Sequence, residues 1–147
     1  MASLVLTALF VAEPVRVTSN SMSPTYRAGD QLVVDKISAR AHVPHRRDVI
    51  AFRLRGSDSL IIKRVVAIAG DAVGLDDGVL VVNGSRVQEA FVDYNLMDAT
   101  YFGPVTVPAG SVFTMGDNRA DSIDSRRFGA VPTNDIVGRV MLRIWPP

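Results

Sequence analysis

Short β-prone runs, separated by Gly, Pro, Asn and Asp, make up most of the chain from Pro14 onward. No long segment repeats its apolar residues with helical period, so we expect a mostly β domain. The pair Asn83-Gly84 predicts a two-residue hairpin turn, because both central positions of such a turn need positive φ. The less regular residues 90–108 are expected to form a long surface connection. The predicted strands cover residues 15–18, 31–37, 48–54, 60–68, 79–82, 111–115 and 136–144.

An uncharged apolar run over residues 1–12 ends at Glu13-Pro14. Proline disfavours helical geometry in the residue before it, so we expect a helix that ends there. At about 1.5 Å per residue this helix covers less than ~20 Å, while a bilayer core needs ~30 Å. We favour the end of a membrane helix or a short interfacial anchor over a buried element. A secretory signal sequence fits poorly, since no basic residue precedes the run.

The length of 147 residues suits one hydrophobic core, so residues 14–147 are interpreted as a single domain that follows the apolar segment 1–13. Sixteen Lys and Arg against fifteen Asp and Glu leave a net charge of +1, which argues against a nucleic-acid partner. The chain has no cysteine, which excludes disulfides, thiolate nucleophiles and cysteine-bound metals.

A metal site is not expected. The two histidines, His42 and His45, lie in an arginine-rich segment interrupted by proline, without the spacing of a zinc site. Residues 117–121 do not match a calcium-binding loop either, because Arg119 occupies the second ligand position between Asp117 and Asp121.

Residues 19–25 place three serines in a turn bounded by proline. A serine hydroxyl is a weak nucleophile and needs a nearby base, and neither histidine suits that role. The remaining candidate base is a neutral lysine, whose pKa must fall far below ~10.4 through desolvation. Of the two lysines, Lys36 follows Asp35 directly and is expected to be solvated or paired.

Lys63 lies within the predicted strand 60–68, where alternation places it on one face with Ile61, Val65 and Ala67. Arg64 shares the opposite face with apolar residues, but arginine stays protonated and cannot accept a hydroxyl proton. Lys63 is therefore the candidate base. The alternative is a lysine whose ammonium group extends past the strand edge into water.

A dense polar loop follows the predicted strand 111–115. Its Asp124 could pair with Arg126 or with Arg119, and either ion pair would fix the loop.

Four segments, taken in order, resemble the conserved motifs of bacterial type I signal peptidases, the Ser–Lys proteases that remove signal peptides. Residues 19–25 look like the nucleophile motif, 47–52 like the following strand, 62–71 like the lysine motif, and 115–129 like the last conserved box. The likeness covers the chain from Phe10 onward. It implies a compact antiparallel β-sheet domain of the signal peptidase type. The short interval between Gly70-Asp71 and Gly116 suggests the form without a large inserted β-domain.

The resemblance also implies a role for each matching residue. Ser21 would attack the scissile carbonyl, and Lys63 would take its proton and return one to the leaving amine. The backbone N–H of Ser21 and the hydroxyl of Ser19 would hold the oxyanion.

Three more residues would support this dyad. Ser122 would hydrogen-bond the Lys63 amine and orient it, while Asp124 and Arg126 would brace the loop.

The implied substrates are signal peptides of exported preproteins with small residues at the cut and two positions before it, the Ala-x-Ala type. No cofactor and no metal is expected. The implied location is the cell membrane, with a lipid surface as partner and the catalytic domain on the extracytoplasmic side.

Three rival hypotheses remain. A specialised relative, such as a pilin-processing or metalloenzyme-maturation protease, would share the chemistry. A self-cleaving repressor of the SOS type would need a DNA-binding segment, but only about twenty residues precede Ser21. A non-catalytic β-domain that binds extended peptides is the third.

Overall fold

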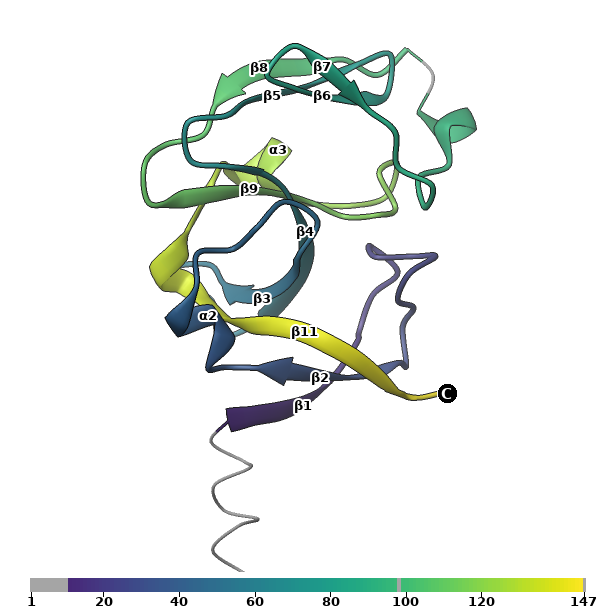
Figure 1. Ribbon diagram of the computed structural model, residues 1–147. Coiled ribbons are helices and arrows are strands. Elements are labelled where there is room, and N and C mark those ends of the chain that lie inside the picture. Colours follow the sequence, from purple (N-terminus) through teal and green to yellow (C-terminus); the bar gives the residue numbers. More distant parts are fainter. Residues whose placement is uncertain (1–10, 98, 147) are drawn as a thin grey trace, which may run out of the picture.

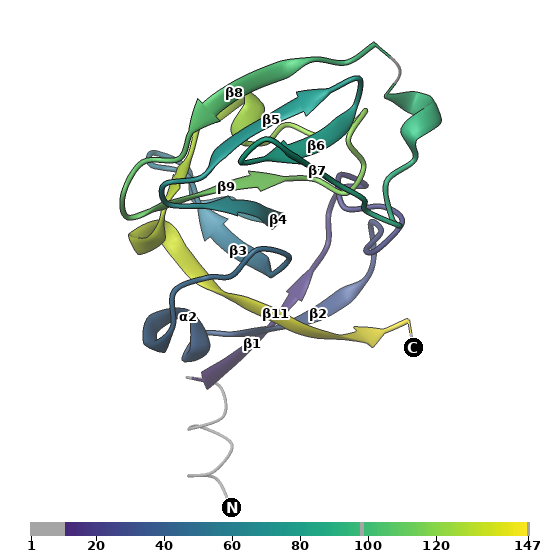
Figure 2. The same ribbon diagram turned by 45° about the horizontal axis from the view of Figure 1, so that its top comes forward.

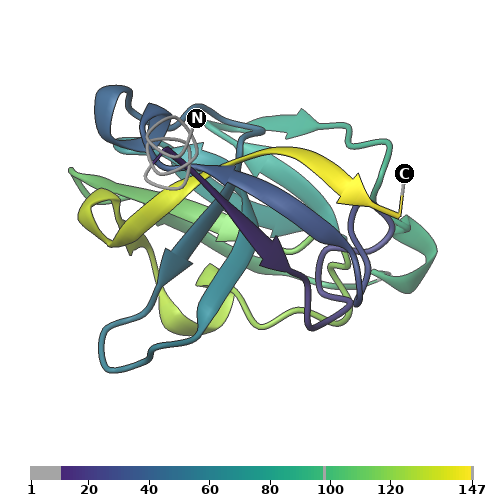
Figure 3. The same cartoon turned by 90° about the horizontal axis from the view of Figure 1, so that it is seen from below.

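Two antiparallel sheets form the body of the computed structural model, which describes residues 11–97 and 99–146 (Figure 1). The larger sheet has seven strands in the order β1-β2-β11-β3-β4-β9-β10. These are β1 (Ala12–Arg16), β2 (Gln31–Asp35), β3 (Val49–Arg53), β4 (Leu60–Ile68), β9 (Ser111–Met115), β10 (Val131–Pro132) and β11 (Ile136–Trp145). Seen from below, β1, β2 and β11 lie side by side (Figure 3).

The second sheet has four strands in the order β7-β6-β5-β8 and lies over β9 and β4 (Figure 2). These are β5 (Ala72–Asp76), β6 (Val79–Val82), β7 (Ser85–Val87) and β8 (Phe102–Thr106). Within residues 12–97 and 99–146, the helical elements are single turns: α2 (Ser38–Ala41), α3 (Ser125–Phe128), and the 3-10 turns η1 (Tyr94–Leu96) and η2 (Thr133–Asp135). The expectation of a mostly β, antiparallel domain is confirmed.

Three apolar clusters fill the interior. The intersheet cluster packs the two sheets together and includes Val66, Ala67 and Phe113. The Met22 cluster lies under β1, β2, β3 and β11 and consists of Val17, Met22, Leu32, Val34, Val49, Ala51 and Val140. The Phe52 cluster lies on the other face of β3 and β4 and consists of Ile50, Phe52, Val65, Val112 and Val131. Neighbouring residues of β4 therefore contact different clusters.

The N-terminal prediction is partly wrong. Ala12 and Glu13 belong to β1, where Glu13 pairs with Val34 of β2, so strand pairing replaces the expected helix at these two residues. Residues 1–10 lie outside the described residues, and their interpretation as an anchor stays a prediction. Within residues 11–97 and 99–146, no helix is long and apolar enough to cross a bilayer.

Three strands of the second sheet, β5, β7 and β8, were not among the predicted strands, and β8 lies within the expected surface connection. In β5 and β8, glycines and a proline interrupt the alternating pattern that marks a strand. Gly74 is needed there, because a Cβ on it would lie 2.6 Å from the carbonyl oxygen of Phe102. The predicted hairpin turn is confirmed, with φ of 51° at Asn83 and 79° at Gly84.

The predicted faces of β4 are wrong beyond Val65, because the strand has a β-bulge at Val66. Val65 pairs with Thr114 and Ala67 pairs with Phe113, so one residue of β4 is left over between the two pairs. Lys63 and Val65 share a face as predicted, but Ala67 lies on the other face, in the intersheet cluster. Simple alternation cannot show where a strand gains an extra residue.

The first half of β4 has one open edge. β3 pairs with residues 60–64 on one side, while β9 pairs with β4 only from Arg64 onward. On the side of β9, no described strand pairs with residues 60–63. This open edge faces β1 across the groove described below.

Asp71 fixes the turn between the two sheets. Its carboxylate accepts hydrogen bonds from Arg46 (2.8 and 2.6 Å), from the Ile68 N–H (2.9 Å) and from the Asn83 side chain (2.9 Å). The hydrogen bond from Arg46 is the main reason that the pKa of Asp71 falls to about 2.

We predict that Asp71→Asn lowers the free energy of unfolding by about 1 to 3 kcal/mol near neutral pH. A carboxylate with a lowered pKa stabilises the fold above its ordinary pKa of 3.8 and loses this effect as pH falls through about 2. The difference from wild type should therefore shrink across that window in urea unfolding curves. The exposed Asp58 is the control, and Asp58→Asn should have little effect at either pH. A difference that stays constant down to about pH 2 contradicts the prediction.

Candidate active site

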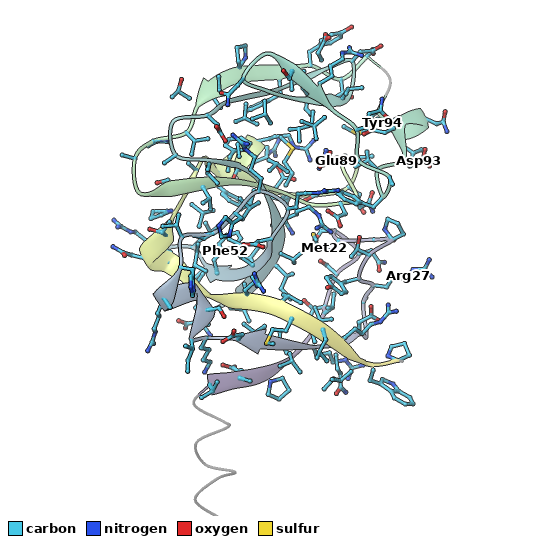
Figure 4. All side chains as sticks on the ribbon, viewed as in Figure 1. Met22, Arg27, Phe52, Glu89, Asp93 and Tyr94 are labelled. Carbon is cyan, nitrogen blue, oxygen red and sulfur yellow. The ribbon has the colours of Figure 1, made fainter. Side chains whose placement is uncertain are left out.

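The loop after β1 holds Ser21 in a fixed position. Ser23 N–H donates to the Asn20 carbonyl (3.0 Å), and the Asn20 side chain accepts from the Ala28 N–H (3.0 Å). The next residue, Met22, is 1% exposed and points from the loop into the interior, where it belongs to the Met22 cluster (Figure 4). Burial of the Met22 side chain anchors the loop. The hydroxyl of the neighbouring Ser21 is left at the surface of the apolar core.

Lys63 and Ser21 meet, as the sequence predicts. Lys63 Nζ lies 2.6 Å from Ser21 Oγ, and the lysine is 5% exposed. The hydroxyl of Ser19 donates to the same Ser21 oxygen at 3.2 Å. The other lysine, Lys36, forms an ion pair with Glu13 at 2.7 Å, as expected for a paired surface residue.

Burial lowers the pKa of the Lys63 amine, because an ammonium group loses its hydration there. The negative charges of Asp124 and Asp117 oppose this effect without reversing it. A neutral amine next to a hydroxyl can accept a proton from it. The pair therefore has the composition and the contact of a nucleophile with its base.

The loop that follows β9 presses against the serine loop. Asn118 donates its backbone N–H to the Ser21 carbonyl (3.0 Å) and its side-chain amide to the Asn20 carbonyl (3.2 Å). A Cβ on Gly116 would collide with the Ser21 carbonyl oxygen and with the Ser122 hydroxyl, so only glycine fits between them. The two loops thus contact each other through backbone atoms at Ser21.

Asp124 and Arg126 brace this loop, as the resemblance implies. Arg126 donates two hydrogen bonds to the Asp124 carboxylate, each 2.9 Å, and the same carboxylate accepts from the Gly116 N–H at 3.0 Å. Burial acts to raise the pKa of Asp124, but the hydrogen bonds and charge of Arg126 outweigh it and lower that pKa overall. The alternative pairing with Arg119 does not form; Arg126 instead donates to the Arg119 carbonyl at 2.9 Å.

The expected hydrogen bond between Ser122 and Lys63 is absent. Ser122 Oγ is buried and makes no hydrogen bond of ordinary geometry with a described residue, although it lies close enough to the Asp124 carboxylate to help lower the pKa of Asp124. It lies against Gly116, which explains why a side chain at that glycine would strike it. Ser122 contacts the dyad loop but does not orient the amine.

One carboxylate at the site was not identified from the sequence. Asp117 is 1% exposed and accepts hydrogen bonds from Arg64 (2.8 and 2.7 Å) and from Thr25 (2.6 Å). The Arg64 guanidinium also stacks over the Phe91 ring at 4.3 Å. From the sequence alone, Arg64 is only a rival to Lys63 that cannot act as a base. Its structural role was missed because its partner lies 53 residues away in the chain.

A second missed residue is Glu89, which follows β7 and lies below the four-stranded sheet in Figure 4. Its carboxylate accepts two hydrogen bonds from the buried Arg119, at 2.6 and 2.9 Å. Arg119 also donates to the Gly116 carbonyl at 3.0 Å. The smaller sheet therefore supports the loop that contacts Ser21. No sequence signal marks Glu89.

A groove of about 520 Å³ runs between β1 and the open edge of β4, and the dyad lies in it. Its lining is mostly apolar, and among the described residues it contains no carboxylate. The lining residues are Val15, Arg16, Val17, Thr18, Ser19, Ser21, Met22, Leu54, Ser59, Leu60, Ile61, Ile62, Lys63, Ile123 and Phe128.

Comparisons with known proteins agree on one family. The family described as signal peptidase, peptidase S26, matches residues 1–145. A probable signal peptidase I-1 of Synechocystis is 39% identical over 161 residues, covering 99% of this chain and 79% of the relative. A signal peptidase I of Bacillus caldolyticus is 36% identical, covering 94% and 82%. The crystal structure of a signal peptidase I from Enterococcus faecalis is similar with a TM-score of 0.60 and 30% identity, covering 68% of this chain and 98% of that one.

We predict that Glu89→Ala lowers the free energy of unfolding by about 3 to 5 kcal/mol, because it leaves the buried charge of Arg119 without a partner. The control is Asp76→Ala, which breaks an exposed ion pair with Arg86 and should destabilise the protein much less. Urea unfolding of both variants gives the comparison. Equal effects would contradict the assignment of the Glu89–Arg119 pair as a buried support.

Proposed function

The chain belongs to the signal peptidase family, peptidase S26, and is a peptidase; we propose that it removes N-terminal signal peptides from exported preproteins with a Ser21–Lys63 dyad. The observation that carries this proposal is the 2.6 Å contact between a buried lysine amine and a serine hydroxyl at the edge of an apolar groove. Membership of a peptidase family disfavours the alternative of a non-catalytic domain. A specialised relative would differ only in its substrate.

In the proposed reaction, the neutral Lys63 amine takes the proton of the Ser21 hydroxyl while Ser21 Oγ attacks the scissile carbonyl carbon. The resulting oxyanion accepts hydrogen bonds from the Ser21 N–H and the Ser19 hydroxyl. The Ser19 hydroxyl already lies 3.2 Å from Ser21 Oγ and needs only to rotate toward the oxyanion. The Lys63 ammonium then protonates the leaving amine, and water hydrolyses the acyl-enzyme.

The substrate would lie as an extended strand between β1 and β4. Four successive antiparallel pairings separate these strands, so β1 and β4 run in the same direction. A peptide parallel to both would place its scissile bond near Ser21 and its amino-terminal side near the start of β1. The apolar part of a signal peptide would then leave the groove where this chain's own apolar residues 1–10 join β1. That arrangement supports a location at the membrane, with the domain on the extracytoplasmic side.

One side of the groove would favour small residues in the substrate. Val17, Met22 and Ile62 line it next to the dyad, and all three pack in or against the Met22 cluster. In an extended peptide, residues two apart face the same side. The residue at the cut and the residue two positions before it would both face this packed surface, where alanine fits and larger side chains do not.

We predict that Ser21→Ala and Lys63→Met each lower kcat/KM by at least about a thousandfold on a preprotein with an Ala-x-Ala site. The matched controls are Ser23→Ala in the same loop and Lys36→Met on the surface, both of which should keep most of the activity. Cleavage is followed by gel mobility. Substantial cleavage by either dyad variant would contradict the mechanism.

The lowered pKa of Lys63 also predicts the pH dependence. Only the neutral amine accepts a proton, so kcat/KM should rise with pH as Lys63 deprotonates, and the midpoint should lie below the ordinary lysine value of 10.5. The measurement is a pH–rate profile with a peptide whose own groups do not titrate in the range. A profile that is flat down to about pH 5 contradicts a lysine base.

A further inference from the structure

Ile123 is an exposed apolar side chain on a firmly held backbone. It is 70% exposed, yet it lies between Ser122, whose hydroxyl is buried, and Asp124, which is fully buried. Asp124 is in turn held by Arg126 and by the Gly116 N–H. An apolar group of another molecule that covered this side chain would be favoured, because it would remove apolar surface from water.

Ile123 lines the groove together with Ile61 and Phe128. Ile61 and Phe128 are partly buried against the Phe52 cluster, which lies on the face of β3 and β4 opposite to the Met22 cluster. The Phe128 ring packs edge-on against Phe52 with 6.0 Å between ring centroids, so this wall is supported from behind. Ile61 and Ile62 are neighbours in β4 and therefore face opposite sides of the groove.

We propose that Ile61, Ile123 and Phe128 form a subsite for the middle residue of the Ala-x-Ala sequence, and that it prefers an aliphatic side chain. The inference rests on the proposed function. If the two small residues of an extended substrate face Met22, the residue between them faces Ile123. An aliphatic side chain at that position would cover the exposed isoleucine and the edge of Phe128.

The charges of the groove disfavour a basic residue at the same position. Among the described residues that line the groove, none is acidic, while Arg16 and Lys63 are basic. A lysine in the substrate would therefore find no counter-charge and would leave water for an apolar wall. The expected order of preference at the middle position is leucine, then glutamine, then lysine.

The test uses three peptides that differ only in this residue, cleaved by the wild-type protein and by Ile123 variants. In the wild type, kcat/KM for the leucine peptide should exceed that for the glutamine peptide about tenfold. Ile123→Ser should lower cleavage of the leucine peptide more than that of the glutamine peptide, bringing the ratio close to one. Ile123→Leu should restore the wild-type ratio.

The control variant is Val43→Ser, since Val43 is 72% exposed and lies outside the groove. Its leucine-to-glutamine ratio should equal that of the wild type. Equal cleavage of all peptides by the wild type, or an unchanged ratio in Ile123→Ser, overturns the subsite and leaves the proposed function intact. Failure of the wild type to cleave any Ala-x-Ala peptide or preprotein overturns both.

Discussion

The removal of one lysine amine from water is the constraint on which the site depends. Lys63 lies near the middle of β4. The first half of this strand pairs with β3, and the second half pairs with β9. Burial at this place disfavours the ammonium form, whereas Asp117 and Asp124 favour it. Because both carboxylates are already paired with arginines, their pull on the amine is partly offset. The fold thus places a lysine next to the Ser21 hydroxyl and stabilises its ammonium form only weakly.

Three buried ion pairs fix the loop that positions Ser21. Asp117 pairs with Arg64 of β4, Asp124 pairs with Arg126 of α3, and Arg119 pairs with Glu89 from the end of the smaller sheet. Each pair joins a different element to residues 116–124, and each guanidinium donates two hydrogen bonds to its carboxylate. Buried pairs of this kind contribute little net stability, but the loss of one partner is costly, so together they favour a single loop conformation.

The sequence predicts the parts of this site that follow from local chemistry. Lys63 could be identified as the candidate base because arginine cannot act as the base and the two histidines lie in an unsuitable segment, whereas the choice of Ser21 among the three serines of its loop came from the resemblance. Most strands could be predicted from alternation. The bulge at Val66, the strand β8 and the partner of Arg119 could not, because each depends on residues that meet only in the folded chain. Ser122 shows the limit of the resemblance, since its hydroxyl lies close to Asp124 but does not bond to the lysine.

The groove opens beside Lys63 because β9 separates from β4 at this point. β9 leaves β4 at the pair Arg64–Met115, and the chain continues directly into Gly116 and the loop against Ser21. Lys63 is the residue of β4 next to this fork. An unpaired strand edge is ordinarily a liability, since it invites pairing with other chains. Here the open edge of residues 60–63 is short, lies beside β1, and ends at the dyad. A peptide that pairs with this edge is therefore brought to Ser21 by the same hydrogen bonds that bind it.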